Sequence, residues 1–207
     1  MKNKVTINIL MLLGFIATIG LFFSYNKIKT DLFKVFHNKY KFIQLDDIIV
    51  DKNELHISFY IEGTYECLRY SLKIRNIVKD YLKKHDEYRN MRVEIFLITY
   101  ANDFSITFAN YDEDDTGIEF ENSYDINYGR FSCANYLSLS DFKGIEDFEI
   151  LRFAYLNDYS DVSALDSVKD LRYLVFSDFG NQKKEKFENI DYNYLSNMHP
   201  NCKIEID

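Results

Sequence analysis

The acidic run at residues 112–117 comes closest to a metal site by its residue types. Its sequence is DEDDTG, and close carboxylates followed by a glycine are typical of calcium loops. An EF-hand loop needs oxygen ligands at alternate positions and a glutamate at the twelfth position, an order that this run lacks. The run is therefore interpreted as an acidic hairpin turn, and we expect no metal there.

The remaining residues that could do chemistry are scattered. The histidines lie far from one another and from the cysteines: His37, His56, His85 and His199, with Cys67, Cys133 and Cys202. This spacing gives no zinc motif, and three separated cysteines allow at most one disulfide, so we expect all three to be reduced. No GxSxG, Walker A, GxGxxG or HExxH motif occurs, and no nucleophile, base and orienting residue can be placed together. The sequence predicts neither an enzyme nor a cofactor.

Residues 131–207 repeat themselves. Residues 151–156 (LRFAYL) and 171–176 (LRYLVF) agree in character at a spacing of 20. Positions 165, 168, 174 and 176 recur at 195, 198, 204 and 206, a spacing of 30 that indicates one loop insertion of about ten residues. The apolar positions are mostly three residues apart with a single step of two, which suits neither a plain helix nor a plain strand. The pattern predicts a coil in which each turn contributes a short strand that packs on the next.

The pattern L-x-x-L-x-L followed by residues 160–171 (SDVSALDSVKDL) resembles the leucine-rich repeats of bacterial internalin-type proteins. It departs from that family at Tyr159, where the family has an asparagine, and the repeat is about two residues short. The resemblance implies a parallel sheet whose outward strand side chains bind a partner. Those side chains would be Arg152, Phe153, Tyr155, Arg172, Tyr173 and Val175. An ordinary α+β domain with aligned leucines is the alternative.

Residues 42–130 read as a mixed segment that caps the repeat. Alternating apolar residues predict strands before and after residues 51–53, and the pattern after Gly63 predicts a helix to about Lys84 with one basic face. That face could bind a membrane or an acidic partner, or it is simply solvated. Two more strands are predicted at 91–100 and 104–111. Together these elements form a small sheet with one helix.

The amino-terminal residues predict a membrane anchor. Residues 5–23 carry no charge, and a helix of that length spans roughly 28 Å, close to the thickness of the bilayer hydrocarbon. A cleaved signal peptide is the alternative, but no small-x-small cleavage site follows. The lysines after the span favour a cytoplasmic domain, whereas the short basic tip is typical of exported anchored proteins, and we expect the domain outside the cell membrane.

Charge narrows the range of partners. The whole chain has a net charge of −8. Residues 1–41 contain seven Lys and one Asp, a net charge of +6, so residues 42–207 have a net charge of −14. A domain this acidic is repelled by phosphate backbones, which argues against nucleic acid. The lysines near the span either contact anionic lipid or simply flank it.

The sequence as a whole predicts an α+β protein with an N-terminal transmembrane helix, a small sheet with one helix, and a short leucine-rich-repeat-like solenoid. The segments are a basic tip (1–4), an anchor (5–24), a basic stalk (25–41), a capping α+β subdomain (42–130) and the repeat (131–207). The expected function is that of a membrane-anchored, non-catalytic module that binds a protein or a cell-surface component through the strand face. The alternative is a structural or regulatory membrane protein whose repeat only packs its own domain.

Overall fold

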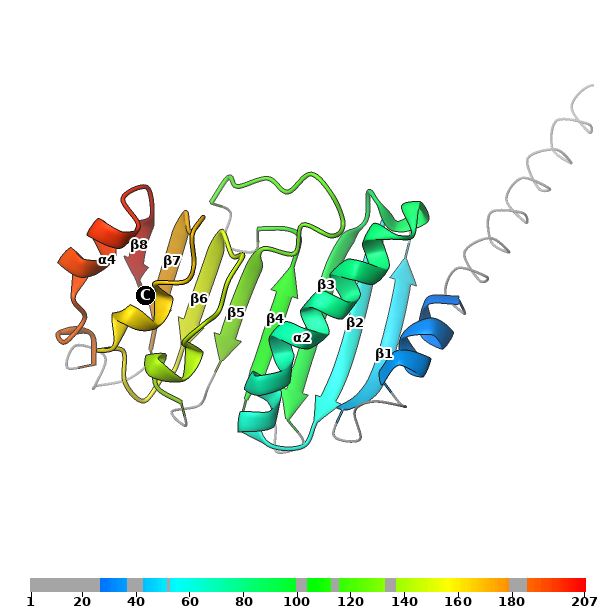
Figure 1. Cartoon of the computed structure of the whole chain (residues 1–207), viewed down its shortest axis with the longest axis horizontal. Helices are drawn as coiled ribbons and strands as arrows, with labels where there is room; N and C mark the ends of the chain where they lie inside the picture. Colours follow the sequence, from blue (N-terminus) through cyan, green and yellow to red (C-terminus); the bar gives the residue numbers. More distant parts are fainter. Residues whose placement is uncertain are drawn as a thin grey trace, which may run out of the picture.

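One mixed sheet of eight strands organises the chain, and each strand pairs with its neighbours in sequence order (Figure 1). The computed structural model describes residues 27–36, 43–51, 53–99, 104–112, 116–132, 137–178 and 186–207. The strands are β1 (Ile43–Asp51), β2 (Glu54–Ile61), β3 (Arg92–Thr99), β4 (Ser105–Ala109), β5 (Tyr128–Ser132), β6 (Ile150–Ala154), β7 (Tyr173–Ser177) and β8 (Lys203–Ile206). The helical elements between them are α2 (Thr64–Lys83), η1 (Asp86–Tyr88), η2 (Leu139–Phe142), η3 (Val162–Leu165) and α4 (Tyr192–Met198).

The first half of the sheet, β1–β4, contains the strands and the helix that alternation and helical spacing predicted. β1 and β2 form an antiparallel hairpin, α2 carries the chain from β2 to the parallel strand β3, and β4 returns antiparallel. β2 and β3 alternate buried and half-buried residues along their length, as strands with one covered face do. The predicted hairpins and the helix after Gly63 are confirmed.

The second half, β5–β8, is parallel throughout, and the chain returns between strands through η2, η3 and α4. The parallel strand pairing predicted for the last third of the chain is therefore present, but it belongs to one mixed eight-stranded sheet, nothing identifies a leucine-rich repeat, and the predicted register is wrong. Leu151 pairs with Leu174, 23 residues along, and not with Leu171, which precedes β7. The predicted spacing of 30 is confirmed, since Leu174 pairs with Ile204.

The fold class predicted from the sequence is corrected in two respects. The separate small sheet and the solenoid are one continuous sheet, because β4 pairs with β5. Among the helices of the described residues, none combines the length and the apolar character needed to cross a membrane, so the predicted transmembrane helix and single-pass membrane location are not upheld. The stretch that suggested them, residues 5–24, lies outside the described residues.

Residues 27–36, which the sequence assigned to a basic stalk, form a helix that belongs to the folded body. Ile28, Leu32 and Phe36 are buried in the same core cluster as β1 and β2. Two lysine side chains of this helix pair with protein carboxylates, Lys27 with Glu87 at 3.0 Å and Lys29 with Asp47 at 3.6 Å. The helix thus covers the end of the core.

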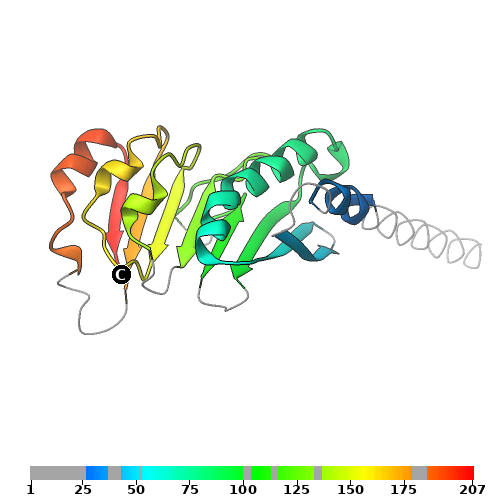
Figure 2. The ribbon, with the colours of Figure 1, turned by 60° about the horizontal axis from the view of Figure 1, so that its bottom comes forward.

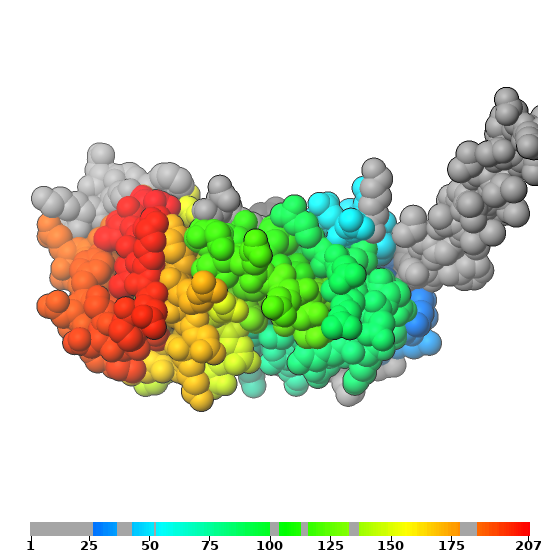
Figure 3. Space-filling model, turned by 90° about the horizontal axis from the view of Figure 1, so that it is seen from above, coloured from blue at the N-terminus to red at the C-terminus, as the bar shows by residue number. Residues whose placement is uncertain are grey.

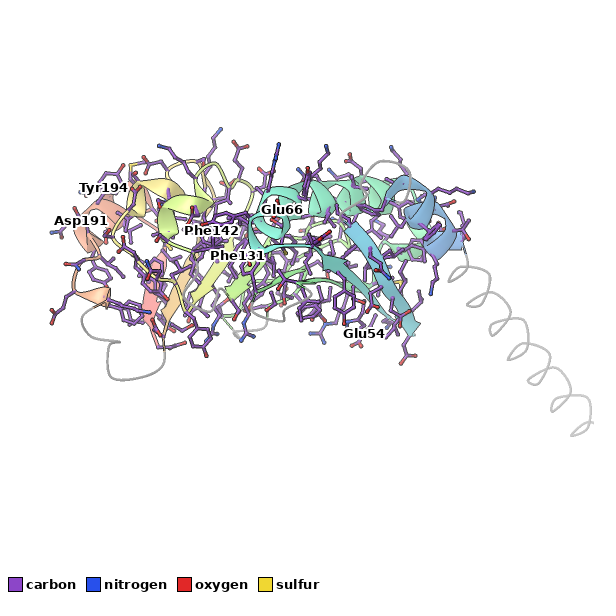
Figure 4. All side chains as sticks on the ribbon, turned by 90° about the horizontal axis from the view of Figure 1, so that it is seen from below. Glu54, Glu66, Phe131, Phe142, Asp191 and Tyr194 are labelled. Carbon is purple, nitrogen blue, oxygen red and sulfur yellow. The ribbon has the colours of Figure 1, made fainter. Side chains whose placement is uncertain are left out.

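α2 and the helical returns lie on the same face of the sheet, and the main core fills the space between them (Figure 2). Three phenylalanines form a ladder on β5, β6 and β7, with ring centroids 5.4 Å apart from Phe131 to Phe153 and 6.1 Å apart from Phe153 to Phe176. Phe142 of η2 closes on the ladder from above, 4.9 Å from Phe131 (Figure 4). The opposite face of the sheet, called here the open face, carries neither α2 nor the returns.

Candidate functional site

The open face is built from the alternate residues of each strand. On β5 and β6 these are Tyr128, Arg130, Ile150 and Arg152, while the residues between them face the main core. Because strands run in register, side chains of neighbouring strands form rows across the face. The middle row contains Ser58, Phe96, Thr107, Arg130, Arg152, Val175 and Glu205.

The segment at 116–120, called here the cover, packs over part of the open face. Ile118 is buried and Phe120 half-buried in a small apolar cluster that includes Tyr128 and Ile150. Figure 3 shows this part of the chain in green across the middle of the molecule. The cover removes one end of the open face from contact with a partner.

Phe153 was predicted to point away from the core, and this prediction is wrong. Its ring is fully buried between Phe131, Phe142 and Phe176. Adjacent residues of a strand point to opposite faces, so Phe153 faces the core where Arg152 faces the open side. Phe153 therefore contributes to stability and not to recognition.

Tyr173 and Val175 do lie on the open face, but both are buried beneath the cover cluster. The hydroxyl of Tyr173 donates a hydrogen bond to the carboxylate of Glu205 on β8. The apolar surfaces of Tyr173 and Val175 already contact other residues of the chain. The structure leaves these two predicted binding residues little surface for a partner.

Arg152 is half-buried on the open face, and its Nη2 donates to Asp207 Oδ2 at 2.9 Å. Tyr155 follows β6 with a φ of 61°, in the left-handed region, and its N–H donates to the carbonyl of Ser177 at 3.0 Å. This backbone position turns the chain out of the strand. Tyr155 is half-buried there and stands outside the rows of the face.

Arg172 precedes β7 and lies at a different site, the edge where the parallel strands begin. Its Nη1 donates to Glu149 Oε2 at 3.2 Å. The six predicted residues thus divide among the core, the covered face, the uncovered face, the turn after β6 and this edge. The structure does not bring them together in one site.

Arg130 is the residue that sequence reasoning missed. It is exposed on β5 and pairs directly with Arg152 on β6, so two arginines occupy neighbouring positions on the open face. The signal was present, because an Arg-Phe pair occurs at 130–131 and again at 152–153, a spacing of 22. The match at a spacing of 20 concealed it.

The amino ends of the parallel strands border a cleft of about 680 Å³, called here the amino-end cleft. Its wall contains Lys79 of α2, Asn127, Asp147, Glu149, Arg172 and His199, a mostly polar set. A hydrogen-bonded chain runs along this wall. Lys79 Nζ donates to Asn127 Oδ1 at 3.3 Å, and Asn127 Nδ2 donates to Glu149 Oε1 at 3.2 Å.

Burial lowers pKa values along this wall. Burial of Lys79, followed by the repulsion from the neighbouring Arg75 guanidinium, lowers the pKa of its ammonium group to about 8. Burial also lowers the pKa of Arg75 to about 10 and that of His199 below its ordinary value. At neutral pH the Lys79 amine is therefore unprotonated far more often than an exposed lysine.

A further cluster of polar side chains lies at the β2–β3 end of the open face. His56 Nδ1 lies 2.8 Å from Glu94 Oε2, which also accepts a hydrogen bond from the Tyr111 hydroxyl at 3.1 Å. The Arg92 guanidinium lies over the Tyr111 ring at 4.2 Å. Ion pairs and ring contacts account for the arrangement without a nucleophile.

The predictions on metals and cysteines concern sites that the structure describes only in part. Across the described residues, no cluster of three His, Cys, Asp or Glu side chains could hold a metal ion. Residues 113–115 of the acidic run lie outside the described residues, as does Cys133. Cys67 and Cys202 are free thiols, and burial raises the pKa of Cys202 to about 12.

Comparison of the chain with protein-family models, curated proteins and solved structures found no match.

Proposed function

We propose that this chain is a non-catalytic protein-binding module that engages an acidic segment of its partner through the uncovered part of the open face. The observation that carries the proposal is the pair Arg130 and Arg152, side by side on parallel strands. Half-buried Phe96 lies in the same row, two strands away from Arg130. Arginine and aromatic side chains are enriched at protein interfaces.

The chemistry of the pair favours carboxylates. A guanidinium group forms two parallel hydrogen bonds with one carboxylate, and Arg152 already holds Asp207 in a charge-assisted hydrogen bond. The next row is lined by small side chains, Ser105, Ser132 and Ala154, which leave room for a polypeptide beside the arginines. Because the whole chain carries a net charge of −8, the partner's carboxylates must be concentrated near the pair.

A library of random dodecapeptides, panned against the full-length chain, tests the proposal. We expect the enriched peptides to be acidic and to lose at least tenfold in affinity when Arg130→Glu reverses one charge of the pair. Loss of one buried or half-buried charged contact at an interface typically costs 2 kcal/mol or more, about 30-fold in Kd. Titration calorimetry of the best peptide against each variant provides the measurement.

Lys73→Glu is the matched control, because Lys73 is exposed on α2, on the helix side of the sheet. It changes the net charge by the same amount as Arg130→Glu and should leave the affinity unchanged. Peptides that bind Arg130→Glu as well as the native chain, or a library that yields no enriched sequence, would remove the proposal.

The alternative, that the coil serves to pack its own domain, is supported by the cover. Tyr173 and Val175, two residues predicted to bind a partner, are buried in the same apolar cluster as Ile118, against which Phe120 packs. Substituting Ile118 with Asp should then destabilise the fold, whereas the peptide affinity of the folded fraction should stay the same if the pair alone recognises the peptide. Measuring the stability and the peptide affinity of this variant separates the two functions.

A further inference from the structure

Lys79 occupies an unusual position for a lysine on a helix surface. Its amine is half-buried in the wall of the amino-end cleft and donates to an amide oxygen, Asn127 Oδ1, and no carboxylate among the described residues is its hydrogen-bond partner. Arg75, one helical turn earlier on α2, donates to the same oxygen at 3.3 Å. A cation thus lies beside the ammonium group while its polar partner is neutral.

Burial and the cations of Arg75 and Lys83 favour the neutral amine, and together they outweigh the carboxylates of Asp147 and Asp125, which favour the ammonium form. Removing an ammonium group from water and placing it near another cation both destabilise the charged form. Desolvation and a neighbouring cation are also the two conditions that activate a lysine as a nucleophile. The Lys79 pKa of about 8 agrees with that reading.

We propose that Lys79 is a nucleophilic amine that forms an imine with small hydrophilic aldehydes entering the amino-end cleft. The neutral amine attacks the carbonyl carbon, so that a C–N bond forms as the π bond of the carbonyl breaks, and the nitrogen loses one proton while the oxygen gains one. Loss of water from this carbinolamine then gives the C=N bond. The balance is one amine and one aldehyde to one imine and one water, with no oxidant or reductant.

The cleft selects the class of aldehyde. Its volume of about 680 Å³ lies within the range of small-molecule sites, and its wall is mainly polar and charged. Asp147, Glu149 and Arg172 can hydrogen-bond to hydroxyl groups of a bound molecule, whereas a purely apolar aldehyde would displace water from them and offer no hydrogen bond in return. The inference concerns a site separate from the open face and does not depend on peptide binding.

Reductive trapping tests it. The full-length chain is incubated with glycolaldehyde and cyanoborohydride at pH 7.5, which reduces any imine to a stable secondary amine, and the modified lysines are mapped by mass spectrometry. We expect Lys79 to be labelled at least tenfold faster than Lys73 and Lys83, which are exposed on the same helix. The labelling rate of Lys79 should rise with pH and reach half its maximum near pH 8, against about 10.4 for an ordinary lysine.

Asn127→Asp is the diagnostic variant, because it places a carboxylate against the Lys79 amine and favours the ammonium form. The midpoint for Lys79 should move to higher pH and its labelling at pH 7.5 should fall several-fold, while Lys73 and Lys83 keep their rates. Labelling of Lys79 that is no faster than that of Lys73 and Lys83 in the native chain would overturn the proposal. So would a Lys79 midpoint that Asn127→Asp leaves in place.

Discussion

Arg75 joins the two halves of the molecule through one buried guanidinium group. From α2 it donates to the carbonyl oxygens of Ile126 at 2.7 Å and Asp147 at 2.6 Å, on the loops that precede β5 and β6. Its central carbon also lies 4.1 Å from the centroid of the Phe148 ring. Asp147 has a φ of 59°, so one of the two carbonyls that Arg75 holds belongs to a strained turn.

Replacing Arg75 with Met should lower the free energy of unfolding by about 3 kcal/mol. The methionine fills part of the volume but leaves the carbonyls of Ile126 and Asp147 buried without their donor. Urea unfolding followed by circular dichroism measures the loss. Arg69→Met on the exposed side of α2 is the control and should change stability by less than about 0.5 kcal/mol. Equal stabilities of the two variants would show that Arg75 does not join the halves.

At this scale the sequence identified candidate residues but could not assign their surroundings. Arg152 and Arg172 were both expected on one face, because their hexamers look alike. In the structure Arg152 contacts Asp207 and Arg172 contacts Glu149, at different edges of the fold. Lys79 donates a hydrogen bond to Asn127, 48 residues away, and no local pattern predicts such a contact.

The strands of the parallel half depend on the phenylalanine ladder. Phe131, Phe153 and Phe176 stack between strands, and each ring also covers part of the adjacent return. Edge-to-face and stacked aromatic pairs stabilise beyond the area that they bury. The ladder therefore fixes the register of β5, β6 and β7.

Phe153→Ala removes the middle ring and should cost about 3–5 kcal/mol, the usual range for a buried phenylalanine. Thermal and urea unfolding give the change directly. Phe33→Ala, at a side chain that is 50% exposed on the helix over 27–36, makes the same chemical change and should cost about 1 kcal/mol or less. A Phe153→Ala variant as stable as Phe33→Ala would show that Phe153 is not a core residue.

Elements were easier to predict from the sequence than their register. Alternation identified β2, β3 and β4, because each has one covered face and therefore one apolar side. In the parallel half, leucine and phenylalanine match one another at the incorrect spacing as well as at the correct one. Hydropathy alone therefore matched residue 151 to residue 171. The matching Arg-Phe pairs that begin at 130 and 152 lie on the strands themselves, and their spacing is the one at which β5 and β6 pair.

A continuous core makes the eight strands one unit at the scale of the whole molecule. One cluster of buried side chains extends from Ile28 on the first described helix to Leu195 on α4, and every strand pairs with the next. Cooperative unfolding follows where burial is continuous and no boundary divides the contacts. The sequence pointed to two subdomains because the antiparallel and repeating patterns differ, and such patterns do not reveal that β4 and β5 pair.

Single-tryptophan variants test this unity, since the chain contains no Trp. Tyr70→Trp on α2 and Tyr194→Trp on α4 place one fluorophore at a half-buried position in each half. We expect the two urea midpoints to agree with each other and with the midpoint from circular dichroism, which serves as the global control. Midpoints that differ between the variants would show that the halves unfold separately.

The irregularity between Leu45 and Asp47 on β1 affects how copies of this chain meet in concentrated solution. β1 forms one margin of the sheet, and a bulge there bends the strand and interrupts the regular sequence of outward donors and acceptors. The helix over 27–36 stands beside the same margin, with Lys29 Nζ 3.6 Å from Asp47 Oδ1 (Figure 1). A strand from another molecule therefore finds no straight template on this side, and growth of the sheet into fibres is blocked at β1.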